Sequence, residues 1–151
     1  MSLSRTLLIA VSLQVALLSH ANWTPLGVGA TGSRSITTFN GAIYVATPPS
    51  GLRKSVNDGA TWTLANTGLP MTGANVNVYS VGHSATALFC GTDQGVYRST
   101  DNGASWVNVN GPLPASGPAI HCTKIYTFGD ATFLVYTGEV LRDGLELSGP
   151  I

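Results

Sequence analysis

Charged side chains are scarce in this sequence. Asp, Glu, Lys and Arg make up 9% of its 151 residues, and seven basic residues balance seven acidic ones. No basic stripe is present that could neutralise a phosphate backbone, so nucleic-acid binding has no electrostatic support. Blocks of like charge are also missing, which argues against acidic tails and polybasic membrane patches. We therefore expect no nucleic-acid partner.

Helical periodicity is missing too, beyond the first 21 residues. Instead the chain carries 18 glycines and eight prolines, with Thr, Val, Asn and Ser abundant. This composition is typical of short strands joined by many tight turns. The sequence predicts an all-β domain with almost no helix.

The longest apolar run lies in residues 1–21. One positive charge, Arg5, precedes mainly apolar residues over Leu7–Leu18, and small residues occupy the −3 and −1 positions of a cleavage site after Ala21. These are the three regions of a secretory signal peptide; an N-terminal membrane anchor is the alternative. We expect a secreted or extracytoplasmic domain over residues 22–151, with no membrane span after cleavage.

Only two cysteines occur, Cys90 and Cys122. Export to an oxidising compartment favours a disulfide between them, whereas their place inside strand-like runs equally favours two buried thiols. A zinc site with His121 is not expected, because the adjacent residues His121 and Cys122 of one strand point to opposite faces. We predict no metal site and no cofactor.

The chain repeats itself at an offset of 44 residues, the distance from Ser55 to Ser99. The repeat aligns without gaps from about Ile43 to Pro70. A period of 40–45 residues with strand-rich content favours propeller blades. The matched positions are Gly51 with Gly95, Lys54 with Arg98, Ser55 with Ser99, Gly59 with Gly103, Ala60 with Ala104, Trp62 with Trp106, Asn66 with Asn110, and Leu69-Pro70 with Leu113-Pro114.

Each period resolves into four short strands separated by turn residues. We predict four-stranded antiparallel blades in three repeats, about 34–70, 75–114 and a partial 119–151. The expected strands are Ser35–Phe39, Ile43–Thr47, Leu52–Ser55 and Thr61–Ala65 in the first repeat; Asn75–Val81, Ala85–Gly91, Gly95–Ser99 and Ser105–Val109 in the second; and His121–Phe128 with Ala131–Thr137 in the third.

The run Ser99-Thr100-Asp101-Asn102-Gly103-Ala104-Ser105-Trp106 resembles the Asp-box, the Ser-x-Asp-x-Gly-x-x-Trp signature of BNR-repeat families. Those families include sialidases, xyloglucan-degrading glycosidases, sortilin-type receptors and photosystem II assembly factors. The earlier copy, Ser55 to Trp62, departs at its third position, where Asn57 stands and Asp58 follows. Asn accepts the same turn hydrogen bonds, so the resemblance holds for both copies and implies a β-propeller fold.

The physical role that we predict for these boxes is structural. Asp or Asn accepts backbone N–H bonds inside the turn, Gly supplies a positive φ, and Trp packs between sheets. The resemblance implies a place on the outer rim, away from a catalytic or binding face. A calcium loop is not expected, because further carboxylates are missing at loop spacing. The predicted structural residues are Ser55, Asn57, Asp58, Gly59, Trp62, Ser99, Asp101, Gly103 and Trp106.

The ring is predicted to be incomplete, with about two full blades plus part-blades. The register survives to Val140-Leu141-Arg142, but no third box follows, and Trp23 could belong to the end strand of a preceding blade. Closed propellers need at least about four blades. Three explanations stay open: a truncated product, a homo-oligomer that completes a ring, or an open array.

Catalytic signatures are absent, and we predict no catalytic residue. A sialidase needs an arginine triad and a Tyr–Glu pair, whereas Arg34, Arg53, Arg98 and Arg142 show no such pattern. A two-carboxylate glycosidase has only Glu139 and Asp143 as candidates. His83 and His121 lack a nucleophile elbow, so strand-end positions are favoured for them.

Two functions remain as hypotheses. The first is a secreted, non-catalytic module that binds a protein or carbohydrate ligand through loops such as Thr47–Ser50 and Pro112–Pro118. The second is a truncated or degenerate relative of an exported glycoside hydrolase. The sequence identifies no individual ligand-binding residue. Asn22 begins an Asn-Trp-Thr acceptor for an N-glycan, which matters only in a glycosylating pathway.

Overall fold

The computed structural model describes residues 23–30, 32–110, 122–128, 131–136 and 139–142, and within these ranges it contains eleven strands and no helix. No helix long and apolar enough to cross a bilayer occurs among them. The strands form three antiparallel sheets: the first blade, β1 (Ser35–Phe39), β2 (Ala42–Ala46), β3 (Leu52–Ser55) and β4 (Thr63–Leu64); the second blade, β5 (Val78–His83), β6 (Leu88–Thr92), β7 (Gly95–Ser99) and β8 (Val107–Asn108); and the third sheet, β9 (Cys122–Phe128), β10 (Ala131–Tyr136) and β11 (Glu139–Arg142).

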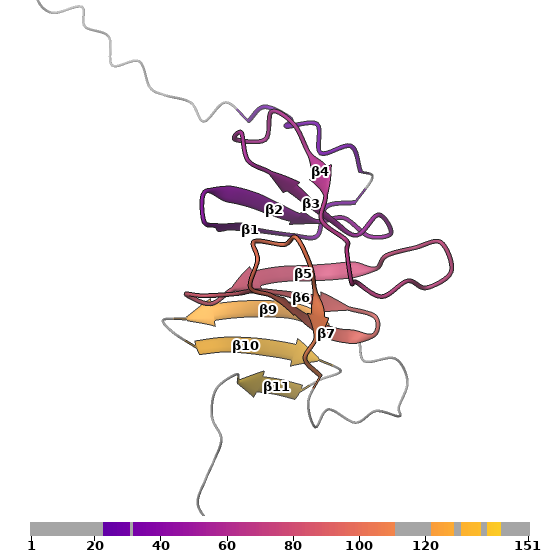
Figure 1. The fold of residues 1–151 in the computed structure, drawn as a ribbon, viewed down its shortest axis with the longest axis vertical. Coiled ribbons are helices and arrows are strands. Elements are labelled where there is room, and N and C mark those ends of the chain that lie inside the picture. Colours follow the sequence, from indigo (N-terminus) through magenta and orange to yellow (C-terminus); the bar gives the residue numbers. More distant parts are fainter. Residues whose placement is uncertain (1–22, 31, 111–121, 129–130, 137–138, 143–151) are drawn as a thin grey trace, which may run out of the picture.

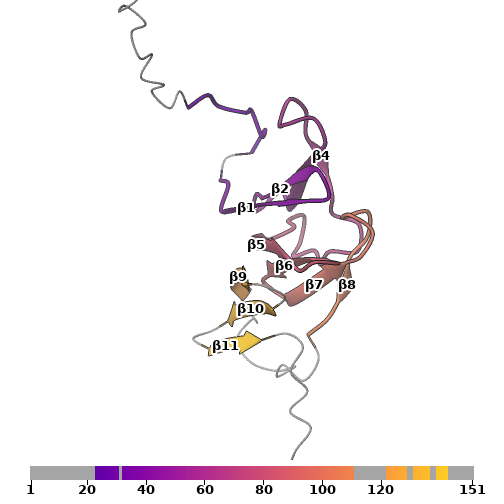
Figure 2. The same ribbon diagram turned by 90° about the vertical axis from the view of Figure 1, so that its left-hand side faces the viewer.

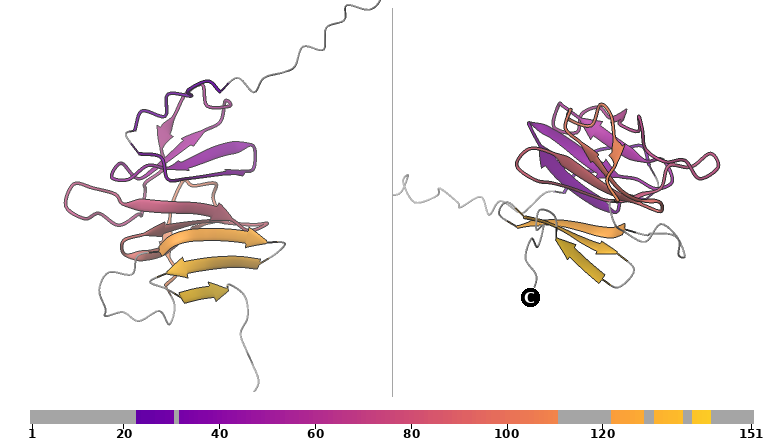
Figure 3. Two further views of the ribbon diagram at one scale, coloured as in Figure 1. Left: turned by 180° about the vertical axis from the view of Figure 1, so that it is seen from behind. Right: turned by 60° about the horizontal axis from the view of Figure 1, so that its bottom comes forward.

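The three sheets stack face to face (Figure 1). Strand β5 contacts both β1 and β9, so the first strands of successive sheets are neighbours. Seen from the side and from below, the stack forms an open arc and not a closed ring (Figures 2 and 3). The prediction of propeller-type, four-stranded blades in an incomplete ring is confirmed.

The repeat register departs from the gapless alignment before the third strand of each blade. The turn between β2 and β3 (residues 47–51) is one residue longer than its counterpart between β6 and β7 (residues 92–95). Equivalent residues are therefore 45 apart before this turn and 44 apart after it, so the single offset of 44 is wrong over β2. The strand pairs that show the change are Ala46 with Leu52 and Gly91 with Val96.

Two core clusters lie between the sheets, because residues alternate between the two faces of each strand. The larger cluster separates the first and second blades and includes Tyr44, Leu52, Leu88 and Trp106. The smaller cluster separates the second blade from the third sheet and comprises Ala87, Phe89, Val96, Cys122 and Ile125, with Leu134 packed against it.

Two glycines allow the third sheet to approach the second blade closely. A Cβ at Gly82 would lie 2.7 Å from Cγ2 of Ile125, and a Cβ at Gly91 would lie 2.6 Å from Sγ of Cys122. Gly82 belongs to β5, so the turn predicted at residues 82–84 is misplaced. The actual turn follows Ser84, whose Oγ accepts hydrogen bonds from the backbone of the next residues.

The segment before β1 is not a strand. Residues 23–30 have no strand partner, and Trp23 is 91% exposed. The described residues provide no sheet beside this segment, so the place of Trp23 in the end strand of a preceding blade stays a prediction. The predicted turn at Gly129-Asp130 and the loop Pro112–Pro118 lie outside the described residues.

Candidate functional site

Residues 99–106, hereafter box 2, form a turn held by its own polar atoms. The Ser99 hydroxyl donates to Asp101 Oδ1 (2.7 Å) and accepts from the Gly103 N–H (2.8 Å). Asp101 also accepts from the N–H and the hydroxyl of Ser105. These bonds, with those from Ser105 foremost, lower the pKa of Asp101 to about 2. Asn102 and Gly103 both have positive φ.

Residues 55–62, hereafter box 1, repeat this arrangement with an amide in place of the carboxylate. Ser55 donates to Asn57 Oδ1 (3.0 Å) and accepts from the Gly59 N–H (2.9 Å). Asn57 Oδ1 accepts from the Thr61 N–H (2.9 Å). In both boxes the polar side chains bond within the turn, where they stabilise the connection between the third and fourth strands.

The first blade contacts box 2 through three side chains. The Tyr44 hydroxyl (2.7 Å) and Lys54 Nζ (2.8 Å) donate to the Asn102 carbonyl, and Asn40 Nδ2 donates to Asn102 Oδ1 (2.7 Å). Burial, and then the charge of Asp101, raise the pKa of Tyr44. Box 2 therefore lies at an inter-blade contact, where Asn102 accepts all three of these bonds.

A separate cleft opens along the first strands of the three sheets. Its volume is about 700 Å³, and it is lined by Arg34, Ser35, Tyr79, Ser80, Lys124, Ile125 and Tyr126. The lining residues stand at or just before the start of β1 and within β5 and β9, so the stacking of the sheets brings together residues that are far apart in sequence. We call this the inner cleft.

Each of the two cations in the inner cleft lies close to an aromatic ring. The Arg34 guanidinium lies 5.6 Å from the Tyr79 ring centre, and Lys124 Nζ lies 6.0 Å from that of Tyr126. Cation–π contacts of this kind hold both partners in place. Ser35 Oγ bonds to the Val81 backbone and joins the first two sheets beside the cleft. Among the described residues that line the cleft, Arg34 and Lys124 are cations and none is a carboxylate.

The inner cleft contains none of the residues that the sequence singled out as turn-forming. Its key side chains, Tyr79, Lys124 and Tyr126, were not predicted, and Arg34 was considered only as one of four arginines. The sequence does contain one indication of the cleft, which is the position of its residues in the repeat. Ser35, Ser80 and Lys124 occupy equivalent places in successive first strands, at offsets of 45 and 44. A gapless offset of 44 hides this equivalence.

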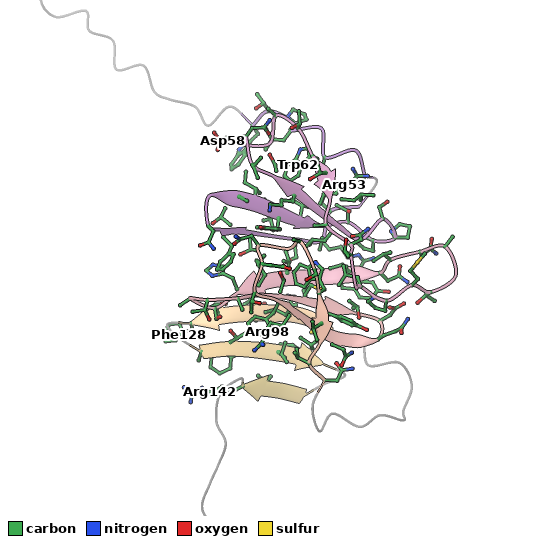
Figure 4. The ribbon with its side chains drawn as sticks, in the orientation of Figure 1. Arg53, Asp58, Trp62, Arg98, Phe128 and Arg142 are labelled. Carbon is green, nitrogen blue, oxygen red and sulfur yellow. The ribbon has the colours of Figure 1, made fainter. Side chains whose placement is uncertain are left out.

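The remaining candidates do not form a site. Arg53, Arg98 and Arg142 lie apart from one another on three different sheets and form no triad (Figure 4). His83 packs against the Phe39 ring, with 5.5 Å between ring centres, and its Nδ1 contacts the Ser84 carbonyl. Among the described residues, no three His, Cys, Asp or Glu side chains cluster as metal ligands. Asn22, His121 and Asp143 lie outside the described residues, and Glu139 is described only in its backbone.

The two cysteines carry free, buried thiols. Cys90 belongs to the cluster between the blades, whereas Cys122 belongs to the cluster on the other face of the second blade. Burial, and then the nearby Cys122, raise the pKa of Cys90, and burial raises that of Cys122 to about 11. Of the two alternatives, this placement favours buried thiols over a disulfide.

Neither protein families nor curated proteins give a match to this chain. Among solved structures, the chain is similar to a GH74 xyloglucanase from Xanthomonas campestris, with a TM-score of 0.50, 17% identity, and coverage of 77% of this chain and 19% of that one. An ancestral GH74 enzyme gives a TM-score of 0.49, 19% identity, and coverage of 74% and 20%. The chain thus spans about a fifth of the length of these structures, and at this identity the first likeness shows a shared propeller-type fold.

Proposed function

We propose that this chain is an exported, non-catalytic binding module of the Asp-box repeat class, and that its inner cleft holds an acidic carbohydrate. The observation that carries this proposal is the pairing of two cations with two aromatic rings in a cleft lined by no carboxylate. Arg34 and Lys124 would pair with carboxylate or sulfate groups. Tyr79 and Tyr126 would pack against sugar rings, with apolar faces and polar edges suited to such ligands.

The Asp-box assignment rests on the two turns. Both place a serine, an Asp or Asn, and a glycine of positive φ in the same hydrogen-bonded arrangement before a tryptophan. In this proposal, the boxes build the blades, and recognition belongs to the inner cleft. Export is the part of the proposal that rests on the signal peptide predicted over residues 1–21.

A calorimetric titration tests the binding role. The full chain is titrated with polygalacturonate and, separately, with neutral xyloglucan. We expect binding of the acidic polymer that weakens as salt rises, because the ion pairs are screened. Arg34→Gln and Lys124→Gln should each weaken binding roughly tenfold, the value of one charge-assisted hydrogen bond. Arg98→Gln, which removes an exposed cation from β7 outside the lining, is the matched control and should bind as the parent does.

The second candidate is a relative of an exported glycoside hydrolase, favoured by the structural likeness to the GH74 xyloglucanase. Polygalacturonate and xyloglucan also distinguish the binding module from the hydrolase relative. Release of reducing ends from xyloglucan by the full chain would support the hydrolase, whereas binding without release supports the module. Absence of binding to either polymer would refute the proposed cleft function.

A further inference from the structure

We propose that a second copy of this chain completes the third sheet. The segment Trp23–Gly29 of one copy would form the fourth strand beside β11 of the other, and two copies would close a six-bladed ring. Each chain would then supply two whole blades, three strands of a third, and the fourth strand of its partner's third blade.

The first support is the contact that each box tryptophan makes. Trp106 Nε1 donates to the carbonyl of Ala65, which directly follows β4 of the preceding blade (2.9 Å). Trp62 Nε1 donates in the same way to the carbonyl of Leu26 (3.1 Å). Leu26 therefore occupies, relative to the first blade, the place that Ala65 occupies relative to the second. The segment lies where the end of a preceding blade belongs.

The sequence of the segment agrees with this position. Trp23–Gly29 and Trp62–Gly68 both begin with Trp-Thr, and the residues that accept the tryptophan bonds are fourth in each. Both reach a glycine at the seventh position, with φ of +69° at Gly29 and +87° at Gly68. The segment therefore repeats the fourth strand and the bend that follows it.

Pro25 fits the strand that we propose. It stands at the place of Leu64 in β4. The Ala65 N–H donates to the Leu52 carbonyl (2.9 Å), so the N–H of Leu64, one residue earlier, points away from β3. A proline at that position costs no bond of the sheet.

The third sheet, as far as the structure describes it, has the free edge that a fourth strand from a second copy would need. Among the described strands it ends at β11, without a fourth strand. The Arg142 guanidinium lies 5.9 Å from the Phe133 ring centre, and Lys54 Nζ lies 5.6 Å from that of Tyr44 at equivalent positions of the first blade. In the first blade Lys54 and Tyr44 both donate to Asn102 of the following box. In the third sheet only the cation, Arg142, could make the equivalent donation, because Phe133 has no hydroxyl. Box 1 is the box left without such a neighbour.

The exposed fractions of side chains in the first strands also indicate that, among the described residues, a sheet is missing beside the first blade. Val81 and Ile125 face the preceding sheet and are 3% and 8% exposed, whereas Ile36 at the equivalent position of the first blade is 65% exposed. A preceding blade would cover Ile36. The third sheet of a second copy has the strand order and the face to do so.

The number of blades favours two copies. A closed ring contains about four to eight blades, and the eleven described strands together with the segment Trp23–Gly29 amount to three four-stranded blades. Two chains joined head to tail therefore give six, and the two identical junctions close the assembly.

A disulfide between the proposed neighbours tests the junction. Leu141 stands in β11 where Arg53 stands in β3, and Arg53 pairs with Leu64. Pro25→Cys combined with Leu141→Cys should therefore form a cross-link between two chains, seen as a covalent dimer on a non-reducing gel. Arg53→Cys combined with Leu64→Cys is the matched control and should cross-link within one chain. The parent chain controls for Cys90 and Cys122.

Light scattering on the uncross-linked parent should give twice the chain mass, and Trp23→Ala should shift it toward monomer. A monomeric parent, or a cross-link confined to one chain, would overturn the proposal, as would the absence of a cross-link when the control forms one. A ladder of trimers and larger species would overturn the six-bladed closure.

Discussion

Box 2 is enclosed by the first blade, whereas box 1, built from the same internal hydrogen bonds, has only residues 23–30 beside it among the parts of the chain that the structure describes. Trp106 is 4% exposed and Trp62 is only half-buried. The Asn102 carbonyl accepts from Tyr44 and Lys54, contacts that come from the preceding blade. The comparison separates two contributions: the turn itself is a local structure, and the burial of its tryptophan depends on the neighbouring blade.

The largest effect that we expect comes from removing the enclosed tryptophan. Trp106→Ala should reduce the free energy of unfolding by about 3–5 kcal/mol, the usual cost of truncating a buried tryptophan. Trp62→Ala should cost about 1–2 kcal/mol, because its side chain is already partly exposed. Urea unfolding of both variants under identical conditions measures the difference. Equal losses would show that the neighbouring blade does not set the contribution of the box tryptophan.

The bend after β4 offers a second comparison, between two glycines of positive φ. A Cβ at Gly68 would lie 2.3 Å from the Trp106 carbonyl oxygen, whereas one at Gly73 would meet nothing within 4 Å. Gly68→Ala and Gly73→Ala both add backbone strain, but only Gly68→Ala also forces the blades apart. We expect Gly68→Ala to cost roughly 1–3 kcal/mol more. Thermal unfolding with Gly73→Ala as control tests this, and similar losses would contradict it.

The third position is Asp101 in box 2 and Asn57 in box 1. We therefore predict that only box 2 makes the stability of the chain depend on acid pH. The pKa of Asp101 is about 2 when folded, below its ordinary unfolded value near 4. Its ionised form therefore stabilises the fold above about pH 4, and this contribution is lost as the pH falls toward 2. Asp101→Asn should flatten that part of the melting-temperature profile, and Asn57→Asp should steepen it. Unchanged profiles in both variants would refute the role of the turn hydrogen bonds.

The smallest effect concerns the two buried thiols. At pH 8, a pKa of about 11 leaves roughly one thiolate in a thousand at Cys122. Iodoacetamide should therefore label neither cysteine quickly in the native chain and both after denaturation, as followed by intact mass. Of the two, Cys122 lies on the sheet without a fourth strand, so it should react first. A native mass two hydrogens lower, with no labelling after denaturation, would show a disulfide instead.

Local sequence was sufficient for three strands and for both boxes, although not for the turn after Ser84. The strands Ser35–Phe39, Leu52–Ser55 and Gly95–Ser99 were predicted with the bounds that they have. Both boxes follow from serine, Asp or Asn, and glycine at fixed spacing, because a turn is stabilised by side chains a few residues apart. The matched Asn66 and Asn110 also behave alike, each accepting an N–H from the third strand of its blade.

Sequence alone could not predict the inner cleft. Arg34, Tyr79 and Lys124 belong to three different sheets, and no spacing motif connects them. They meet because Gly82 and Gly91 let β9 pack closely on the second blade, a contact that involves residues more than thirty positions apart. The one-residue difference between the turns at 47–51 and 92–95 also concealed the equivalence of the first strands.

The sequence by itself determined the all-β class and the blade repeat, through composition and periodicity, and the two box turns, because hydrogen bonds within a few residues specify a turn. Only the tertiary structure decided which box tryptophan is buried, where the two thiols lie, and that Leu26 accepts the bond of Trp62 as Ala65 accepts that of Trp106. Those outcomes depend on which sheet packs against which, and packing between sheets is set by surfaces that distant segments build together.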